Sequence, residues 1–472
     1  MSTNLQFRLV FLCSSLLLCT ALAAASDTPN QDLEKQFQLA VTQYNTGHFA
    51  EAAAQLEGLL PKLPQSFEVH ELLGLVYTAQ SQDAKATEPL EIAVRLKPDS
   101  AEARTNLAAN LSRMGKLGPA GEQFRKALEL EPKDYDANHN FGEFYAQSGR
   151  IADAISYLET AQRINPTSYG NGYDLATAYL LTGKLDAASQ LVESLLQQKN
   201  TAELHNLLGQ IEEKQGKFVA SASDFEAAAH MDPSEENLFQ WGSEFLLHRT
   251  YEPAIDVFQR GTQLYPASPR LKIGLGVALY SRGKYDDAVK ALLAAADLDP
   301  SDPRCYYFLS KAYDSSPNQA DEVIQRFRGF SELHPENALA NYYYAMSLWK
   351  GKRTEDPEVN LQQVKSLLQK SISLDPKLAE AHVQLGNLYS DQRDYAQSIA
   401  EYVRALDLNS NLPDAHYRLG QDYVHTGQKD HAQQEFEIYQ RLRAQHMAEI
   451  DKEKAAVQQF VYSAKAAPST KP

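Results

Sequence analysis

One pattern of residues recurs about every 34 positions, roughly twelve times between Leu33 and Arg441. Each copy has an apolar residue before a glycine, a ring or leucine three residues on, a turn glycine, a small residue, a large apolar residue and a proline. Two copies read Phe141-Gly142, Tyr145, Gly149, Ala154, Leu158, Ala161, Pro166 and Leu275-Gly276, Leu279, Gly283, Ala288, Leu292, Ala295, Pro300. A unit this short packs only on its neighbours, so the chain is expected to form one elongated domain.

Each unit is predicted to be a helix, a tight turn and a second, antiparallel helix, because apolar residues recur at helical spacing on both sides of a glycine. The glycine readily adopts the left-handed conformation that ends the first helix, and the proline ends the second helix. The turn glycines are Gly47, Gly115, Gly149, Gly183, Gly216, Gly283 and Gly427. The prolines are Pro64, Pro98, Pro132, Pro166, Pro233, Pro266, Pro300, Pro335 and Pro376.

This pattern resembles the tetratricopeptide repeat (TPR), in which W-x2-L-G-x2-Y…A-x3-F…P recurs about every 34 residues. The resemblance implies an all-α, right-handed superhelical solenoid of about twelve helix-turn-helix repeats over residues 33–441. In this family a second glycine, such as Gly142, lies where the two helices of a repeat cross, and its missing Cβ would let their backbones approach. Residues 442–463 are predicted to form a capping helix, and residues 464–472 a disordered tail.

The first 25 residues have the features of an export signal. Arg8 is their only charged residue, an apolar stretch runs from Leu9 to Leu22, and Ala23-Ala24-Ala25 offers a cleavage site. We therefore expect an exported protein, periplasmic or secreted, with no membrane span after cleavage. The alternatives are an uncleaved N-terminal anchor and a lipoprotein signal at Cys19, although Leu18 precedes that cysteine where a small residue is usual.

Charge and cysteine content exclude further classes of protein. The net charge of −16 and the lack of a Lys/Arg cluster argue against binding to nucleic acid, which needs a basic face. Cys305 is the only cysteine after the signal, so no internal disulfide is expected.

No catalytic motif is present, so we expect neither an enzyme nor a cofactor. The sequence contains no H-E-x-x-H, C-x-x-C, P-loop or G-x-S-x-G pattern. His425 and His431 lie on either side of a turn at the wrong spacing for a metal pair, and Cys305 is interpreted as an inert thiol.

The candidate binding residues follow from the resemblance, which implies that the first helices line a concave groove. Six of the twelve fifth positions carry aromatic residues, and His139 adds a further ring. These residues are Phe37, Tyr173, Phe239, Tyr307, Tyr342 and Tyr417. Such rings would anchor a ligand, or they would pack between adjacent first helices.

Polar residues at these positions match no standard ligand of the family. The lysine clamp for a C-terminal carboxylate is missing, since Glu71 and Thr105 are among the residues at its position. Asn106 and Asn140 occupy consecutive sixth positions, as in an asparagine ladder that binds peptide backbones, but Asp174 and Leu207 end the series.

The leading hypothesis is a non-enzymatic scaffold that holds a protein or an extended peptide in its groove. An envelope polysaccharide assembly factor, whose rings would touch sugars, is the alternative, and an enzyme disguised in the repeats is a third hypothesis. Sequence alone does not name the partner, because a fold used this widely does not determine function.

Overall fold

The computed structural model describes residues 28–316, 319–350 and 357–466, and over these ranges the chain is entirely helical. The predicted export signal, residues 1–25, lies outside the described residues. In the described ranges, no helix is both long enough and apolar enough to span a membrane.

The chain divides into two compact units, and the boundary along the sequence lies between Gln215 and Gly216. This boundary lies inside the predicted solenoid, at the turn of the sixth repeat. The N-terminal unit contains α1 (Thr28–Asn45), α2 (Phe49–Leu59), α3 (Phe67–Ala79), α4 (Asp83–Leu96), α5 (Ala101–Arg113), α6 (Leu117–Leu130), α7 (Tyr135–Gln147), α8 (Ile151–Ile164), α9 (Tyr169–Thr182), α10 (Leu185–Gln198) and α11 (Ala202–Gln215). All of these helices are short, as the repeat predicts.

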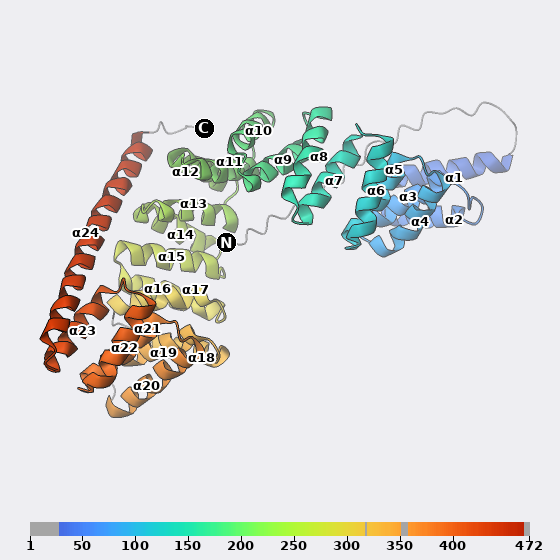
Figure 1. Ribbon diagram of the computed structural model, residues 1–472. Coiled ribbons are helices and arrows are strands. Elements are labelled where there is room, and N and C mark those ends of the chain that lie inside the picture. The colour runs from blue at the N-terminus through green and yellow to red at the C-terminus, as the bar shows by residue number, and fades with distance from the viewer. Residues whose placement is uncertain (1–27, 317–318, 351–356, 467–472) are drawn as a thin grey trace. The chain divides into compact units, whose positions relative to one another are not determined.

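The C-terminal unit continues the same alternation of first and second helices. It contains α12 (Phe218–Met231), α13 (Glu235–Leu247), α14 (Tyr251–Leu264), α15 (Pro269–Arg282), α16 (Tyr285–Leu298), α17 (Pro303–Ser315), α18 (Ala320–Leu333), α19 (Ala338–Lys350), α20 (Pro357–Leu374), α21 (Ala379–Asp391), α22 (Tyr395–Leu408), α23 (Pro413–His425) and α24 (Lys429–Ala466). Within this unit, α13 to α17 follow one another in a stack (Figure 1).

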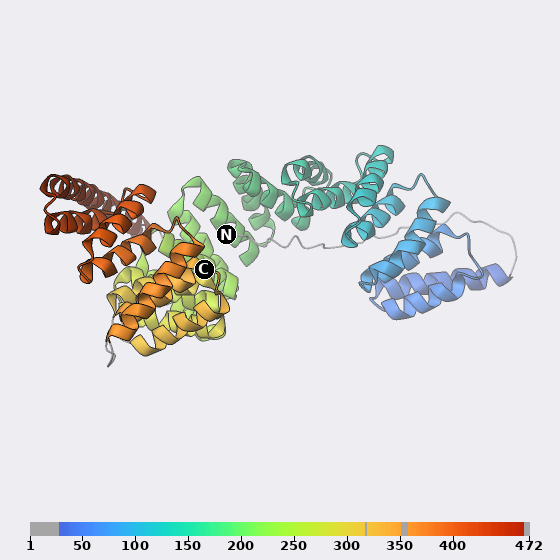
Figure 2. The same ribbon diagram turned by 60° about the horizontal axis from the view of Figure 1, so that its bottom comes forward.

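The last helix, α24, is much longer than the others. It packs against α23 (Figure 2) and also contacts α12. Residues 442–463, predicted as a separate cap, belong to this one continuous helix, as do residues 464–466 of the predicted tail. The helix thus extends the second helix of the last repeat.

Seven of the first helices begin at a capping side chain placed one residue before the repeat starts, whereas α21 and α23 follow Leu378 and Leu412 and have no side-chain cap. In α5, the Ser100 hydroxyl accepts a hydrogen bond from the Ala103 amide, and the Asp134 carboxyl does the same for Ala137 in α7. The same cap is present at Ser66, Ser168, Ser234 and Ser268, and Asp302 caps α17 by accepting from the Arg304 amide, two residues on. A cap of this kind stabilises a helix by about 0.5–2 kcal/mol, so these residues help to fix where their own repeats begin.

The turn glycines adopt the predicted left-handed conformation. All seven have φ between 73° and 87°. Three repeats without a turn glycine keep the same conformation at Ser81, Arg249 and Arg393, with φ between 58° and 61°. Packing of the two helices therefore imposes the turn, and glycine only makes it less costly.

The glycines at the helix crossings act differently from our expectation. A Cβ added to Gly142 would lie 2.6 Å from Leu158 Cγ and Cδ2, whereas the nearest backbone atom of the second helix would lie at 3.4 Å. The same relation, with a large side chain sixteen residues later, recurs at Gly74, Gly242, Gly276, Gly386 and Gly420, which face Leu90, Phe258, Leu292, Tyr402 and Phe436. Each glycine is therefore a socket for a large side chain of the second helix rather than a point of backbone contact.

Candidate binding site on the first helices

First helices lie next to first helices in both units, so equivalent positions form rows. In the N-terminal unit α3 contacts α5, α5 contacts α7, and α7 contacts α9. In the C-terminal unit the pairs are α13 with α15, α15 with α17, α17 with α19, and α21 with α23. The fifth and sixth positions of each first helix belong to these rows, and they carry all seven candidate residues.

The row in the N-terminal unit is polar and acidic. The half-buried Asn106 donates a hydrogen bond from Nδ2 to Glu71 Oε1, at 3.2 Å. Burial, followed by the nearby charge of Glu102, raises the pKa of Glu71 to about 7. Asn140, the next candidate of the ladder, is also half-buried. Asn106 is therefore engaged by a side chain of the preceding repeat.

A second acidic group lies further along this row, on α7 and α9. His139, Glu143 and Asp174 are all buried, and each offers one ligand atom within 4.8 Å of the others. Burial lowers the pKa of His139, raises that of Glu143 to about 8 and raises that of Asp174 to about 7. The histidine is therefore neutral, and both acids resist ionisation.

Two of the candidate rings are partly covered by neighbouring side chains. Tyr173 is half-buried and stacks on Tyr169, with ring centroids 6.5 Å apart. Phe239 is half-buried under the Arg270 guanidinium, whose central carbon lies 3.6 Å from the ring centroid. Glu236 in turn forms an ion pair with Arg270. The free face of Phe239 is thus occupied by a cation from its own chain.

The rings on α17, α19 and α23 differ in exposure. Tyr342 on α19 is half-buried and packs against the apolar core, and burial raises its pKa. Tyr307 on α17 is 46% exposed, and Tyr417 on α23 is 40% exposed. Tyr307 and Tyr417 are therefore the most exposed of these rings, although the Lys311 ammonium lies 5.9 Å from the centroid of the Tyr307 ring.

Tyr417 is held in place by contacts with the last helix. Its ring lies 5.8 Å from that of Phe436 and 5.1 Å from that of Tyr439, both on α24, and its hydroxyl accepts a hydrogen bond from Gln421 Nε2 at 3.2 Å. The ring of Tyr307 packs edge to face against Phe308. An exposed ring that packs against a neighbouring ring suits a rigid anchor.

Other features noted in the sequence have local roles. Burial, above all, raises the pKa of the Cys305 thiol to about 12, and its Sγ lies 3.0 Å from the Asp302 carbonyl oxygen. Such a thiol is not reactive at neutral pH. His425 stacks on Tyr395, and His431 packs against Tyr423.

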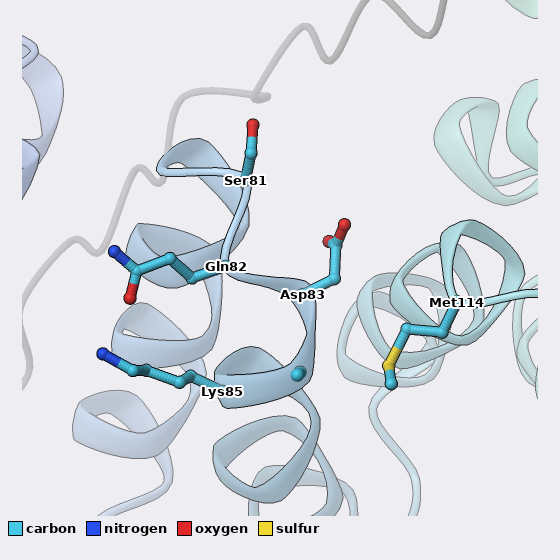
Figure 3. Close-up of a pocket in the computed structure, with 6 residues that line it drawn as sticks. Ser81, Gln82, Asp83, Lys85 and Met114 are labelled. Carbon is cyan, nitrogen blue, oxygen red and sulfur yellow. The ribbon is translucent and has the colours of Figure 1, made fainter.

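An open depression lies where the turn between α3 and α4 meets the end of α5. Ser81, Gln82, Asp83, Ala84, Lys85 and Met114 line it. Met114 points toward the start of α4, while the side chains of Gln82 and Lys85 point away from Met114 (Figure 3). Asp83 Oδ1 already accepts a hydrogen bond from Arg113 Nε, at 2.7 Å. The only acid in this depression is therefore neutralised by its own chain.

Three family models match the chain, and all are described as tetratricopeptide repeats. They cover residues 111–168 and 145–211, residues 276–314 and 386–427, and residues 37–101. The chain belongs to the TPR family. This agrees with the all-helical fold, the turn glycines and the side-by-side first helices.

Curated relatives share parts of the repeat region. The chain is 27% identical over 234 residues to TPR repeat-containing protein YpiA of Bacillus subtilis, covering 49% of this chain and 53% of that protein. It is 21% identical over 210 residues to the human protein O-mannosyl-transferase TMTC1, covering 44% of this chain and 23% of that protein. The chain thus spans about half, or less, of the length of these relatives.

Solved structures resemble the chain in fold. The type IV pilus biogenesis factor PilW is 25% identical and aligns over 44% of this chain and 97% of its own, with a TM-score of 0.41. The hetero-tetramer Cut9–Hcn1 of APC/C contains a chain that is 14% identical and aligns over 90% of this chain and 96% of its own, with a TM-score of 0.39.

Sequence reasoning missed the group formed by His139, Glu143 and Asp174. The sequence pattern presents His139 as a ring at a fifth position, and it presents Asp174 as the residue that ends an asparagine series. The available signal was that the fifth and ninth positions of one first helix lie beside the sixth position of the next, where two acids and a histidine meet.

Proposed function

We propose that this TPR protein is a non-enzymatic scaffold that binds a protein or an extended peptide along its first helices. The observation that carries the proposal is the exposure of Tyr307 and Tyr417 at equivalent positions of two repeats in the C-terminal unit. Large exposed rings on rigid helices are typical anchors of protein interfaces, where they dominate the binding energy. Membership of a family of repeat proteins supports the scaffold role.

The test uses the two exposed candidate tyrosines of the C-terminal unit. A photo-crosslinking amino acid placed at position 307 or 417 should capture the partner, which then serves in titrations. Changing Tyr307 and Tyr417 together to alanine should weaken its binding at least about tenfold, because each anchor contributes about 1 kcal/mol or more. The melting temperature should change little, since truncation of exposed side chains costs little stability.

Two variants control for indirect effects. Tyr285 on the second helix α16 is 36% exposed, so Tyr285→Ala removes a comparable ring from the other helix class and should leave affinity unchanged. Tyr342→Ala should instead lower the melting temperature, because this ring packs against the core. Unchanged affinity in the Tyr307 and Tyr417 double variant would remove these rings as anchors.

We also propose that the scaffold works outside the cytoplasm, because residues 1–25 combine a single arginine, an apolar stretch and an alanine-rich site. N-terminal sequencing of protein recovered from the envelope fraction should then begin near Ser26. Recovery of the chain from the cytoplasm with Met1 retained would contradict this localisation.

A further inference from the structure

Three electron-pair donors converge between α7 and α9 in the N-terminal unit. They are His139 and Glu143, one helical turn apart on α7, and Asp174 on α9. His139 Nε2 lies 3.9 Å from Glu143 Oε1, and no two of the three ligand atoms are more than 4.8 Å apart. Two ligand atoms bound at about 2.1 Å to one zinc ion are at most about 4.2 Å apart. Small side-chain movements would therefore let all three atoms contact a single ion.

The histidine is oriented with its lone pair toward the two acids. Asn171 Nδ2 donates to the Leu158 carbonyl oxygen at 3.0 Å and to Gln162 Oε1 at 2.8 Å, so its Oδ1 is the acceptor that faces His139 Nδ1 at 3.2 Å. Nδ1 must then carry the proton of the neutral ring, which leaves Nε2 free to bind. Stacking of the Tyr135 ring on His139 also restricts the plane of the imidazole. Metal-binding histidines are commonly held by an outer hydrogen bond of this kind.

Glu143 supplies an independent observation. Its side chain is 3% exposed, and its Oε1 atom is buried without a hydrogen-bond partner among the described residues. A buried polar atom without a partner costs free energy, so native proteins rarely leave one unsatisfied. This same oxygen lies 3.9 Å from His139 Nε2, in a group whose three ligand atoms lie within 4.8 Å of one another.

We propose that His139, Glu143 and Asp174 bind one divalent transition-metal ion, with Zn²⁺ as the best-fitting ion. An imidazole nitrogen with two carboxylate oxygens suits Zn²⁺ better than Mg²⁺ or Ca²⁺, which prefer oxygen ligands alone. Three protein ligands leave one position of the ion open to water or to another ligand. This site goes beyond the proposed scaffold role and does not depend on it.

The experiment titrates ZnCl₂ into the chelator-treated full chain. We expect one saturable equivalent of Zn²⁺ and a rise in melting temperature on binding. Glu143→Gln keeps the shape of the side chain but removes its charge, and it should weaken this binding at least about tenfold. Glu71→Gln is the matched control, because Glu71 is also buried on a first helix of the same unit but lies outside the group. It should bind Zn²⁺ like the unaltered protein.

Each outcome decides the proposal. If the unaltered protein shows no saturable binding of Zn²⁺, the proposal is wrong. Glu143 and Asp174 would then be two protonated acids buried beside His139. Equal affinity in Glu143→Gln and the unaltered protein would overturn it too, because the ion would then bind elsewhere. If Glu143→Gln fails to fold, X-ray absorption of the unaltered Zn²⁺ complex decides. One imidazole among oxygen ligands supports the site, whereas two or more imidazoles contradict it.

Discussion

Replacing Gly142 by leucine is expected to lower the free energy of unfolding by about 1 to 3 kcal/mol, the usual cost of overpacking a core. A Cβ alone would already lie 2.6 Å from Leu158, which is fully buried, and leucine adds three more carbons in the same direction. Chemical denaturation measures the loss. Hydrogen exchange should rise mainly in α7, α8 and the helices that contact them, because repeats couple only to their neighbours. A uniform loss of protection along the chain would contradict this one-dimensional coupling.

A size swap tests whether Leu158 is the residue that excludes a side chain from position 142. Leu158→Ala alone should cost about 2 to 5 kcal/mol through the cavity that it leaves. In the double variant, the leucine introduced at position 142 can occupy part of that cavity, so the combined loss should be smaller than the sum of the two single losses. Gly118→Leu is the control, since a Cβ at Gly118 meets no atom within 4 Å. If the loss of stability in the double variant equals the sum of the two single losses, Leu158 is not the residue that excludes a side chain from position 142.

The regularity of the fold could be predicted from sequence because each repeat carries its own stop and start signals. The turn glycines all have positive φ, and the predicted pairs of helices follow the repeat. The left-handed turns at Arg249 and Arg393 could not be predicted from residue type, since arginine has no preference for this conformation. There the helices on either side impose the turn. The partner of each crossing glycine was also missed, because a period of 34 residues does not reveal which side chain fills the socket.

The candidate site could be predicted only to the level of position within a repeat. Tyr307 and Phe239 occupy the same position, yet the first is open and the second lies under Arg270. The exposure of Phe239 depends on a residue from the next repeat, which position within a single repeat does not reveal. The group at His139 shows the same limitation, because its members belong to different positions of two repeats.

Replacing Glu71 by glutamine is expected to change how stability depends on pH. Burial holds the pKa of Glu71 in the folded protein at about 7, against an ordinary value of 4.5. Between these two values the folded state keeps a proton that the unfolded chain releases, so stability falls as pH rises through this range and levels off above it. The shift corresponds to a loss on the order of 3 kcal/mol at full ionisation. Glutamine has the same shape, cannot ionise and can still accept the hydrogen bond from Asn106.

Chemical denaturation at pH 5 and pH 8.5 measures the effect. Glu71→Gln should be within about 1 kcal/mol of the unaltered protein at pH 5 and be more stable than it at pH 8.5, by up to about 3 kcal/mol. Glu143 and Asp174 add a dependence of the same sign, but both proteins retain them, so the difference between the two isolates Glu71. Glu88→Gln, which changes an exposed acid on α4, should give no such difference. An equal stability change at both pH values would mean that Glu71 ionises in the folded protein without penalty, because the first-helix row there is open to water.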